Sequence, residues 1–275
     1  MKVFLICALC STLIFGTAKA APPSKETPTS QEIQALHLSA EQGNADAQFK
    51  LGGMYNGGTG VRQDYAEAVK WFRLAANQGN TNAQFVLGLV YKLGINVTQD
   101  YAEAVKWFQL AADQGDSMAQ FNLGLMYYFG EGVRQDYAEA VKLYRLAAHQ
   151  GNANAQNNLG LMYKNGYGVR QDYAEALSCY RLAADQGNSI AQFNLGTMYY
   201  NGKGIRQDYA EAVKWFQLAA DQGHPQAQFL LGVIYSNGKG VKKNKKIAKE
   251  WFGKSCDNGE QKGCDEYRKL KEQGY

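Results

Sequence analysis

Proline is nearly absent from most of this 275-residue chain. Three of its 4 prolines lie in the stretch APPSKETPTS, and only Pro225 follows them. Because an interior proline removes a hydrogen bond and clashes with the preceding turn, long proline-free sequence is typical of helical structure. Histidine is scarce too: the chain has 3, with no His or Cys pair at metal-ligand spacing, so we expect no metal site and no cofactor.

Other absences narrow the function. The sequence has no G-x-S-x-G elbow and no S-x-x-K, S-D-N or K-T-G motif, which argues against a serine hydrolase or a β-lactamase. No segment after residue 30 is long and apolar enough to cross a membrane. We therefore expect a soluble protein that is not an enzyme.

The first thirty residues predict export. Lys2, the apolar run VFLICALCSTLIFG and the small residues Ala18–Ala20 form a signal peptide over residues 1–20, followed by a proline-rich linker over 21–30. An alternative, a lipoprotein acylated at Cys10, fits poorly because Cys7 to Leu9 is no small-residue lipobox. The mature chain should be periplasmic or secreted. Removing residues 1–20 leaves 27 basic and 25 acidic residues, a near-neutral balance that argues against nucleic-acid binding.

Two blocks recur along the chain with one period. The ten residues QDYAEAVKWF stand at 63–72, 99–108 and 207–216, and QDYAEAVKLY and QDYAEALSCY lie between the second and third copies. A second block, AQFKLGGMY and its variants, keeps the same interval. A fixed period of this size indicates a stacked repeat architecture, in which each unit buries its apolar face only against its neighbours.

Both blocks read as helices, so the fold class is all-α. In the first block, apolar residues from Tyr65 to Ala76 fall at helical spacing. Asp64 is placed as N-cap, and Glu67 completes a D-x-x-E capping arrangement. Gly79 ends the helix. A G-x-G turn joins the helices, and one turn carries Asn96 in place of a glycine, which indicates a positive φ there. We predict an α/α superhelical solenoid of two-helix repeats over 45–80, 81–116, 117–152, 153–188, 189–224 and 225–260. Atypical helices should cap its ends, with the C-terminal cap over 261–275.

This pattern resembles the Sel-1-like repeat family, relatives of tetratricopeptide repeats. The signature A-x-x-x-L-G-x-x-Y, then G-x-G-V-x-x-D-x-x-x-A-x-x-W-[FY]-x-x-A-A-x-x-G, recurs with few lapses across residues 31–275. The resemblance implies a scaffold that binds other proteins, in signalling, envelope assembly or host contact for exported bacterial members. Some cysteine-rich relatives are associated with penicillin binding and weak β-lactamase activity, so a cell-wall or β-lactam-interacting protein is the alternative.

The cysteines differ in their expected roles. Cys256 and Cys264 flank the junction of the last repeat with the terminal helix, at a spacing similar to that in cysteine-rich relatives, and an oxidising compartment favours their disulfide. Cys179 stands where other repeats carry Trp71, Trp107, Trp215 and Trp251, so we expect it to be a buried, unreactive thiol.

Candidate binding residues lie on the first helix of each repeat. In tetratricopeptide-like relatives this helix lines the concave face, and peptide-binding members often carry Asn at the position held here by Lys50, Val86, Asn122, Asn158, Asn194 and Leu230. An Asn amide both donates and accepts, which suits an extended peptide backbone. Asn157 replaces a Phe and should widen the polar patch. The aromatic candidates are Tyr128, Phe129 and Tyr200. Simple tolerance of Asn on an exposed helix, and packing of the rings at the turns, remain alternatives.

The C-terminal end gathers lysines in KGVKKNKKIAKEW. These side chains form either a solvated end of the molecule or a contact for an acidic partner or membrane surface. The residues of that possible contact are Lys242, Lys243, Lys245 and Lys246.

Overall fold

The computed structural model describes residues 28–275, so the expected signal peptide and most of the expected linker lie outside the described residues. All regular structure in the described part is helical. The chain divides into two compact units, Met1–Asp136 and Tyr137–Tyr275. None of the described helices is long and apolar enough to cross a membrane.

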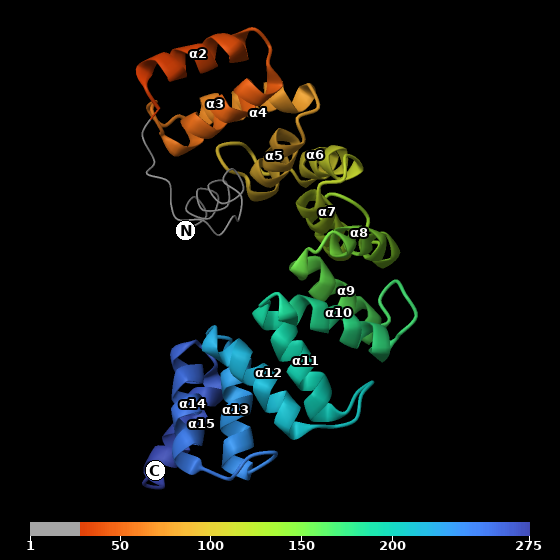
Figure 1. The fold of residues 1–275 in the computed structure, drawn as a ribbon, viewed down its shortest axis with the longest axis vertical. Helices are drawn as coiled ribbons and strands as arrows, with labels where there is room; N and C mark the ends of the chain where they lie inside the picture. The colour runs from red at the N-terminus through yellow and green to blue at the C-terminus, as the bar shows by residue number, and fades with distance from the viewer. Residues whose placement is uncertain (1–27) are drawn as a thin grey trace. The chain divides into compact units, whose positions relative to one another are not determined.

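Each unit is a series of antiparallel helices joined by short turns (Figure 1). Unit 1 contains α2 (Ser30–Glu41), α3 (Ala45–Gly57), α4 (Tyr65–Asn77), α5 (Thr81–Leu93), α6 (Tyr101–Asp113) and α7 (Ser117–Phe129). Unit 2 contains α8 (Tyr137–His149), α9 (Ala153–Asn165), α10 (Tyr173–Asp185), α11 (Ser189–Asn201), α12 (Tyr209–Asp221), α13 (Pro225–Asn237), α14 (Lys245–Asp257) and α15 (Gln261–Glu272). The predicted all-α fold of paired helices is confirmed.

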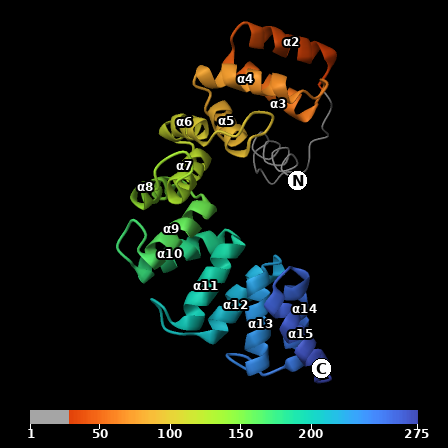
Figure 2. The ribbon, with the colours of Figure 1, turned by 180° about the vertical axis from the view of Figure 1, so that it is seen from behind.

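The odd-numbered helices from α3 to α13 are the first helices of the repeats, and the even-numbered ones from α4 to α14 are the second helices. Consecutive helices pack on each other within each unit, as α3 does on α4, α5 on α6, and α13 on α14, which also contacts α15 (Figure 1 and Figure 2). The glycine in each first helix allows this closeness: a Cβ on Gly196 would lie 2.8 Å from the ring of Phe216.

The helix starts follow the predicted caps with one correction. The Asp64 carboxylate accepts hydrogen bonds from the N–H groups of Ala66 and Glu67, as an N-cap does. However, the backbone N–H of Asp64 donates to the carbonyl of Tyr55, and the Glu67 side chain pairs with Lys70 at 3.1 Å instead. The D-x-x-E capping arrangement was therefore wrong, because the turn already supplies an acceptor for that N–H group.

The G-x-G turns have two backbone reasons for glycine. The first glycine is the left-handed C-cap of the first helix, as at Gly202 (φ 65°), and the second also has positive φ. A Cβ on the second glycine would collide with the preceding second helix: at Gly168 it would lie 2.3 Å from the carbonyl carbon of Tyr137. Among the described residues, Asn96 is the one non-glycine residue with positive φ (55°), as predicted.

Candidate binding face

The predicted asparagines of unit 2 form a short chain of hydrogen-bonded amides across two repeats. Asn194 on α11 donates through Nδ2 to Oδ1 of Asn157 on α9 at 3.0 Å. Asn157 donates in turn to Oδ1 of its neighbour Asn158 at 3.3 Å. Asn158 and Asn194 are half-buried at the surface, and within the described chain no group bonds to Nδ2 of Asn158 or Oδ1 of Asn194. One donor and one acceptor are thus left for a ligand.

Asn157 has a different role from the one we expected. It is only 7% exposed, so it does not widen the polar patch; it connects the two half-buried amides of Asn158 and Asn194 by hydrogen bonds. In repeats that keep the Phe, this position packs on the second helix, as Phe193 does on Phe216 with ring centroids 5.9 Å apart. In the repeat of Asn157 the second helix offers Tyr180, which is fully buried.

Asn122 belongs to unit 1 and does not join this chain. Its Nδ2 donates to the carbonyl of Met118 on its own helix at 2.9 Å. The equivalent positions elsewhere in unit 1 are Lys50 and the buried Val86, neither of which offers an amide. The row of asparagines expected from the sequence is therefore one linked pair in unit 2 and a separate residue in unit 1.

The aromatic candidates lie at the ends of first helices. The rings of Tyr128 and Phe129 meet edge to face at 4.9 Å, and Phe129 is exposed. Tyr200 packs edge to face on Tyr209 at 5.2 Å, and Lys239 Nζ lies 5.4 Å from its ring centroid and 3.4 Å from its hydroxyl. Tyr200 is thus held in place at the turn, which favours the packing alternative for this residue.

A row of buried glutamines was missed by the sequence analysis. Gln192 donates through Nε2 to the carbonyl of Ala184 in the preceding repeat, and its Oε1 accepts from Gln222 Nε2 at 2.9 Å. Five further first-helix glutamines donate to the equivalent carbonyl, and they are Gln48, Gln84, Gln120, Gln156 and Gln228. The sequence did contain a signal for this row, because two glutamines recur at the repeat period. One is the Gln of each Ala-Gln pair, and the other is the Gln of most Gln-Gly pairs. We call the Gln192-type contact the glutamine latch.

The terminal lysines lie at the turn before α14 and along that helix. Lys245 Nζ lies 4.6 Å from the ring centroid of Tyr275, and Lys249 donates to the backbone carbonyl of Tyr275. Lys242, Lys243 and Lys246 are exposed and have no ion pair within the described chain. Asn244 caps α14 where most other second helices begin with an Asp, so this helix start lacks a carboxylate.

The two cysteine predictions agree with the structure. Cys256 on α14 and Cys264 on α15 form a disulfide, with Cα atoms 4.5 Å apart. Cys179 is free and buried, and burial raises the pKa of its thiol to about 11, which leaves it protonated and unreactive at neutral pH. Residues 28–275 contain no cluster of three or more His, Cys, Asp or Glu arranged to hold a metal ion.

Comparison with known proteins agrees with this architecture. The family model described as Sel1 repeat matches residues 45–80, 81–116, 117–152, 153–188, 189–224 and 225–260. A solved Sel1 repeat protein from Oxalobacter formigenes is 34% identical, with a TM-score of 0.74, 82% of this chain covered and 90% of that chain. A protective antigen of uropathogenic Escherichia coli strains, which displays an SLR fold, is 38% identical with a TM-score of 0.61.

The alignment with the antigen covers 88% of this chain but 60% of the antigen's length. A search of curated proteins found no match. The six matched repeats extend over most of the sequence and coincide with the helix pairs of the structure. The chain therefore belongs to the Sel1 repeat family.

Proposed function

We propose that this protein is an exported scaffold that binds an extended peptide, or an extended segment of another protein, on the exposed face of its first helices, with no catalysis of its own. The observation that carries the proposal is the chain of amides from Asn194 through Asn157 to Asn158. It leaves a free donor and a free acceptor on neighbouring helices, and a peptide backbone offers the complementary groups.

Two further observations support the exported location. A disulfide such as Cys256–Cys264 persists in oxidising compartments, whereas cytosolic thiols are kept reduced. The Escherichia coli relative at 38% identity is a protective antigen, although this chain spans 60% of its length.

Selection of short unstructured peptides from a displayed library tests the proposal. We expect peptides that bind the mature chain and lose about tenfold in affinity against the Asn158→Ala/Asn194→Ala variant, since each lost hydrogen bond contributes about 0.5–1.5 kcal/mol. N-methylation of the contacted peptide bond should cause a similar loss. Asn122→Ala is the matched control, because its amide is bonded to its own helix.

Unchanged affinity for the double variant would refute the asparagine site. A nitrocefin assay distinguishes the scaffold from the cell-wall or β-lactam alternative. A scaffold gives no turnover above buffer, whereas measurable hydrolysis by the mature chain would favour an enzyme.

We also propose an acidic partner for the C-terminal lysines. The segment from Lys239 to Lys249 carries six lysines and no acidic residue, whereas the whole chain is close to neutral. Because the start of α14 has neither the capping Asp nor the following Glu of the earlier repeats, its positive charge is not compensated locally.

A further inference from the structure

Each second helix before the last exposes a leucine at the same position. These leucines are 41–54% exposed and recur at the repeat period, and they are Leu74, Leu110, Leu146, Leu182 and Leu218. Helix α2 differs from the second helices in most of its sequence but has Leu38, 57% exposed, at the equivalent place. Single exposed leucines are ordinary on protein surfaces, but an exposed leucine at the same position of each successive second helix is not a random distribution. We call this set the leucine row.

Folding does not require leucine at this position. In α14 the equivalent residue is Lys254, whose Nζ lies 4.1 Å from the ring centroid of Trp251. The position therefore accepts a charged side chain, and the row ends there. Other outward positions of the second helices vary between repeats: Lys214 is Ser178 in an earlier copy, and Asp221 is His149. The leucine does not vary before α14.

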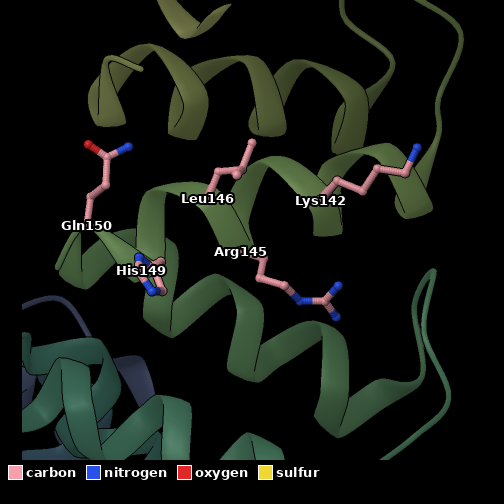
Figure 3. A pocket seen from close by; sticks show the side chains of 5 residues that line it. All are labelled: Lys142, Arg145, Leu146, His149 and Gln150. Carbon is pink, nitrogen blue, oxygen red and sulfur yellow. The ribbon is translucent and has the colours of Figure 1, made fainter. Parts of the chain in front are cut away.

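Charge is arranged in one order around the leucines of unit 2. On α8, Lys142 and Leu146 extend from one side of the helix, as does Gln150 just after its end, and Arg145 and His149 extend from the other side, around a shallow hollow (Figure 3). On α10, Arg181 stands directly before Leu182 and Asp185 follows one turn later. On α12, Lys214 precedes Leu218 and Asp221 follows it. Basic side chains thus lie on the N-terminal side of the row, where Lys142 and Lys214 are paired with Glu139 and Glu211. Acidic side chains follow the leucines on α10 and α12.

We propose that the leucine row of unit 2 packs antiparallel against the same row of a second copy of this chain. A two-fold axis at the middle of the row places Leu182 against Leu182 of the second copy and Leu146 against its Leu218. The antiparallel direction then places Arg181 opposite Asp185 and Arg145 opposite Asp221 across the interface. Within one copy these arginines also donate to the hydroxyls of Tyr199 and Tyr163. A self-complementary patch of this kind is what a two-fold interface requires.

The charge order favours a second copy over other occupants. An anionic membrane surface selects a uniformly basic face, whereas this face carries Asp185 and Asp221 as well as Arg145 and Arg181. Unit 1 lacks the full charge pattern. Each later leucine is preceded by a basic residue, whereas Gln34 and His37 stand at the equivalent places before Leu38. The proposal therefore places the interface in unit 2.

The mature chain is tested by analytical ultracentrifugation over a wide concentration range. We expect a monomer–dimer equilibrium for the wild type, and a monomer for the Leu146→Lys/Leu182→Lys/Leu218→Lys variant with an unchanged circular dichroism spectrum. The matched control is Leu38→Lys/Leu74→Lys/Leu110→Lys in unit 1, which should still dimerise. Asp185→Arg/Asp221→Arg should weaken the dimer by placing like charges opposite each other.

A cysteine cross-link tests the position of the axis. In a Cys179→Ser background, Leu182→Cys should form a disulfide-linked dimer on mild oxidation, and Leu110→Cys should not. A wild type that is monomeric at all concentrations refutes the proposal. So does a dimer that the unit 2 variant leaves intact. A monomer that instead binds anionic lipid vesicles through the same leucines also overturns it, and assigns the row to a membrane surface.

Discussion

At the scale of single residues, amide side chains have two different structural roles in this protein. Each buried glutamine donates to a carbonyl at the end of the preceding repeat. Gln192 and four others also accept from a second amide, so that they connect three helices. The half-buried asparagines of unit 2, Asn158 and Asn194, are linked through Asn157 and retain one free donor and one free acceptor. The first set fixes the stack of repeats, and the second leaves polar groups available to a ligand.

Replacing one glutamine of the latch should destabilise the stack locally. Gln192→Leu keeps a similar volume at a position that is 4% exposed, and it removes two hydrogen bonds, one to the carbonyl of Ala184 and one from the amide of Gln222. Both partners keep other bonds, the carbonyl from Gly187 and the amide to Gly187 and Leu218. We expect a loss of about 1–3 kcal/mol in the free energy of unfolding, measured by urea denaturation. Gln226→Leu, at an exposed position of α13, should leave the midpoint nearly unchanged. Equal midpoints for the two variants would contradict the role of the latch.

His224 gives one helix start a dependence on pH. Its Nδ1 accepts from the N–H of Ala227 at 3.4 Å as the N-cap of α13, and its ring stacks on Phe193 at 4.7 Å. Burial lowers the pKa of His224. The unfolded chain therefore binds the proton more readily than the folded one, and stability falls as the pH drops through the unfolded pKa of about 6.5.

We expect the free energy of unfolding to decrease by about 1 kcal/mol between about pH 7 and about pH 5. His224→Asn should remove this part of the decrease, because Asn188 caps α11 in the same way without a titrating group. Denaturation curves for both proteins at several pH values make the comparison. A pH slope that the substitution does not alter would assign the decrease to other groups.

At the scale of elements, the two end helices depart from the repeat. Helix α2 begins with a full capping box between Thr29 and Glu32, which the internal Asp caps lack. Helix α15 is largely polar and buries little besides Gly263 and Leu270. Since so small an apolar contact holds a helix weakly, the disulfide to α14 supplies the remaining constraint.

Removing that bridge should release α15. Cys264→Ser is expected to lower the free energy of unfolding by about 2–3 kcal/mol, with faster amide exchange confined to α15 and the end of α14. Reductant should have the same effect on the wild type and none on the variant. Cys179→Ser serves as the control and should respond to reductant as the wild type does.

The elements were predictable because their signals are local. The caps, the terminal glycines and the positive φ of Asn96 all follow from single residues at fixed offsets. The burial of Asn157 was not predictable, because it depends on how α9 lies against its neighbours. The leucine row was missed for a similar reason. Leu74 directly precedes the buried Ala75 and Ala76, and the sequence of such an apolar segment does not show which of its residues face solvent.

At the scale of the whole molecule, charge is unevenly distributed. The segment 239–249 holds six of the basic residues, so the remainder of the mature chain is net acidic. Four other lysines are each paired with a Glu one turn earlier, and they are Lys70, Lys106, Lys142 and Lys214. None of the lysines in 239–249 forms an ion pair within the described chain, and they are the positive charges most available to a partner.

Poly-glutamate is a suitable probe of this end. We expect the mature chain to bind it at low ionic strength and to lose the binding as salt is raised. Lys242→Gln/Lys243→Gln/Lys245→Gln/Lys246→Gln should abolish binding, whereas the same change at the four paired lysines should have little effect at equal net charge. Equal weakening by both variants would show that overall charge, and not this end, determines the interaction.

The uniform latch also bears on how the gene evolves. Since each repeat presents the same glutamine and the same acceptor carbonyl, a chain that lost or gained one 36-residue repeat would still close each of its interfaces. Where the codons of the three copies of QDYAEAVKWF also match, misaligned recombination can add or remove a repeat. Natural isolates should therefore differ in repeat number, while the distinct end helices stay single.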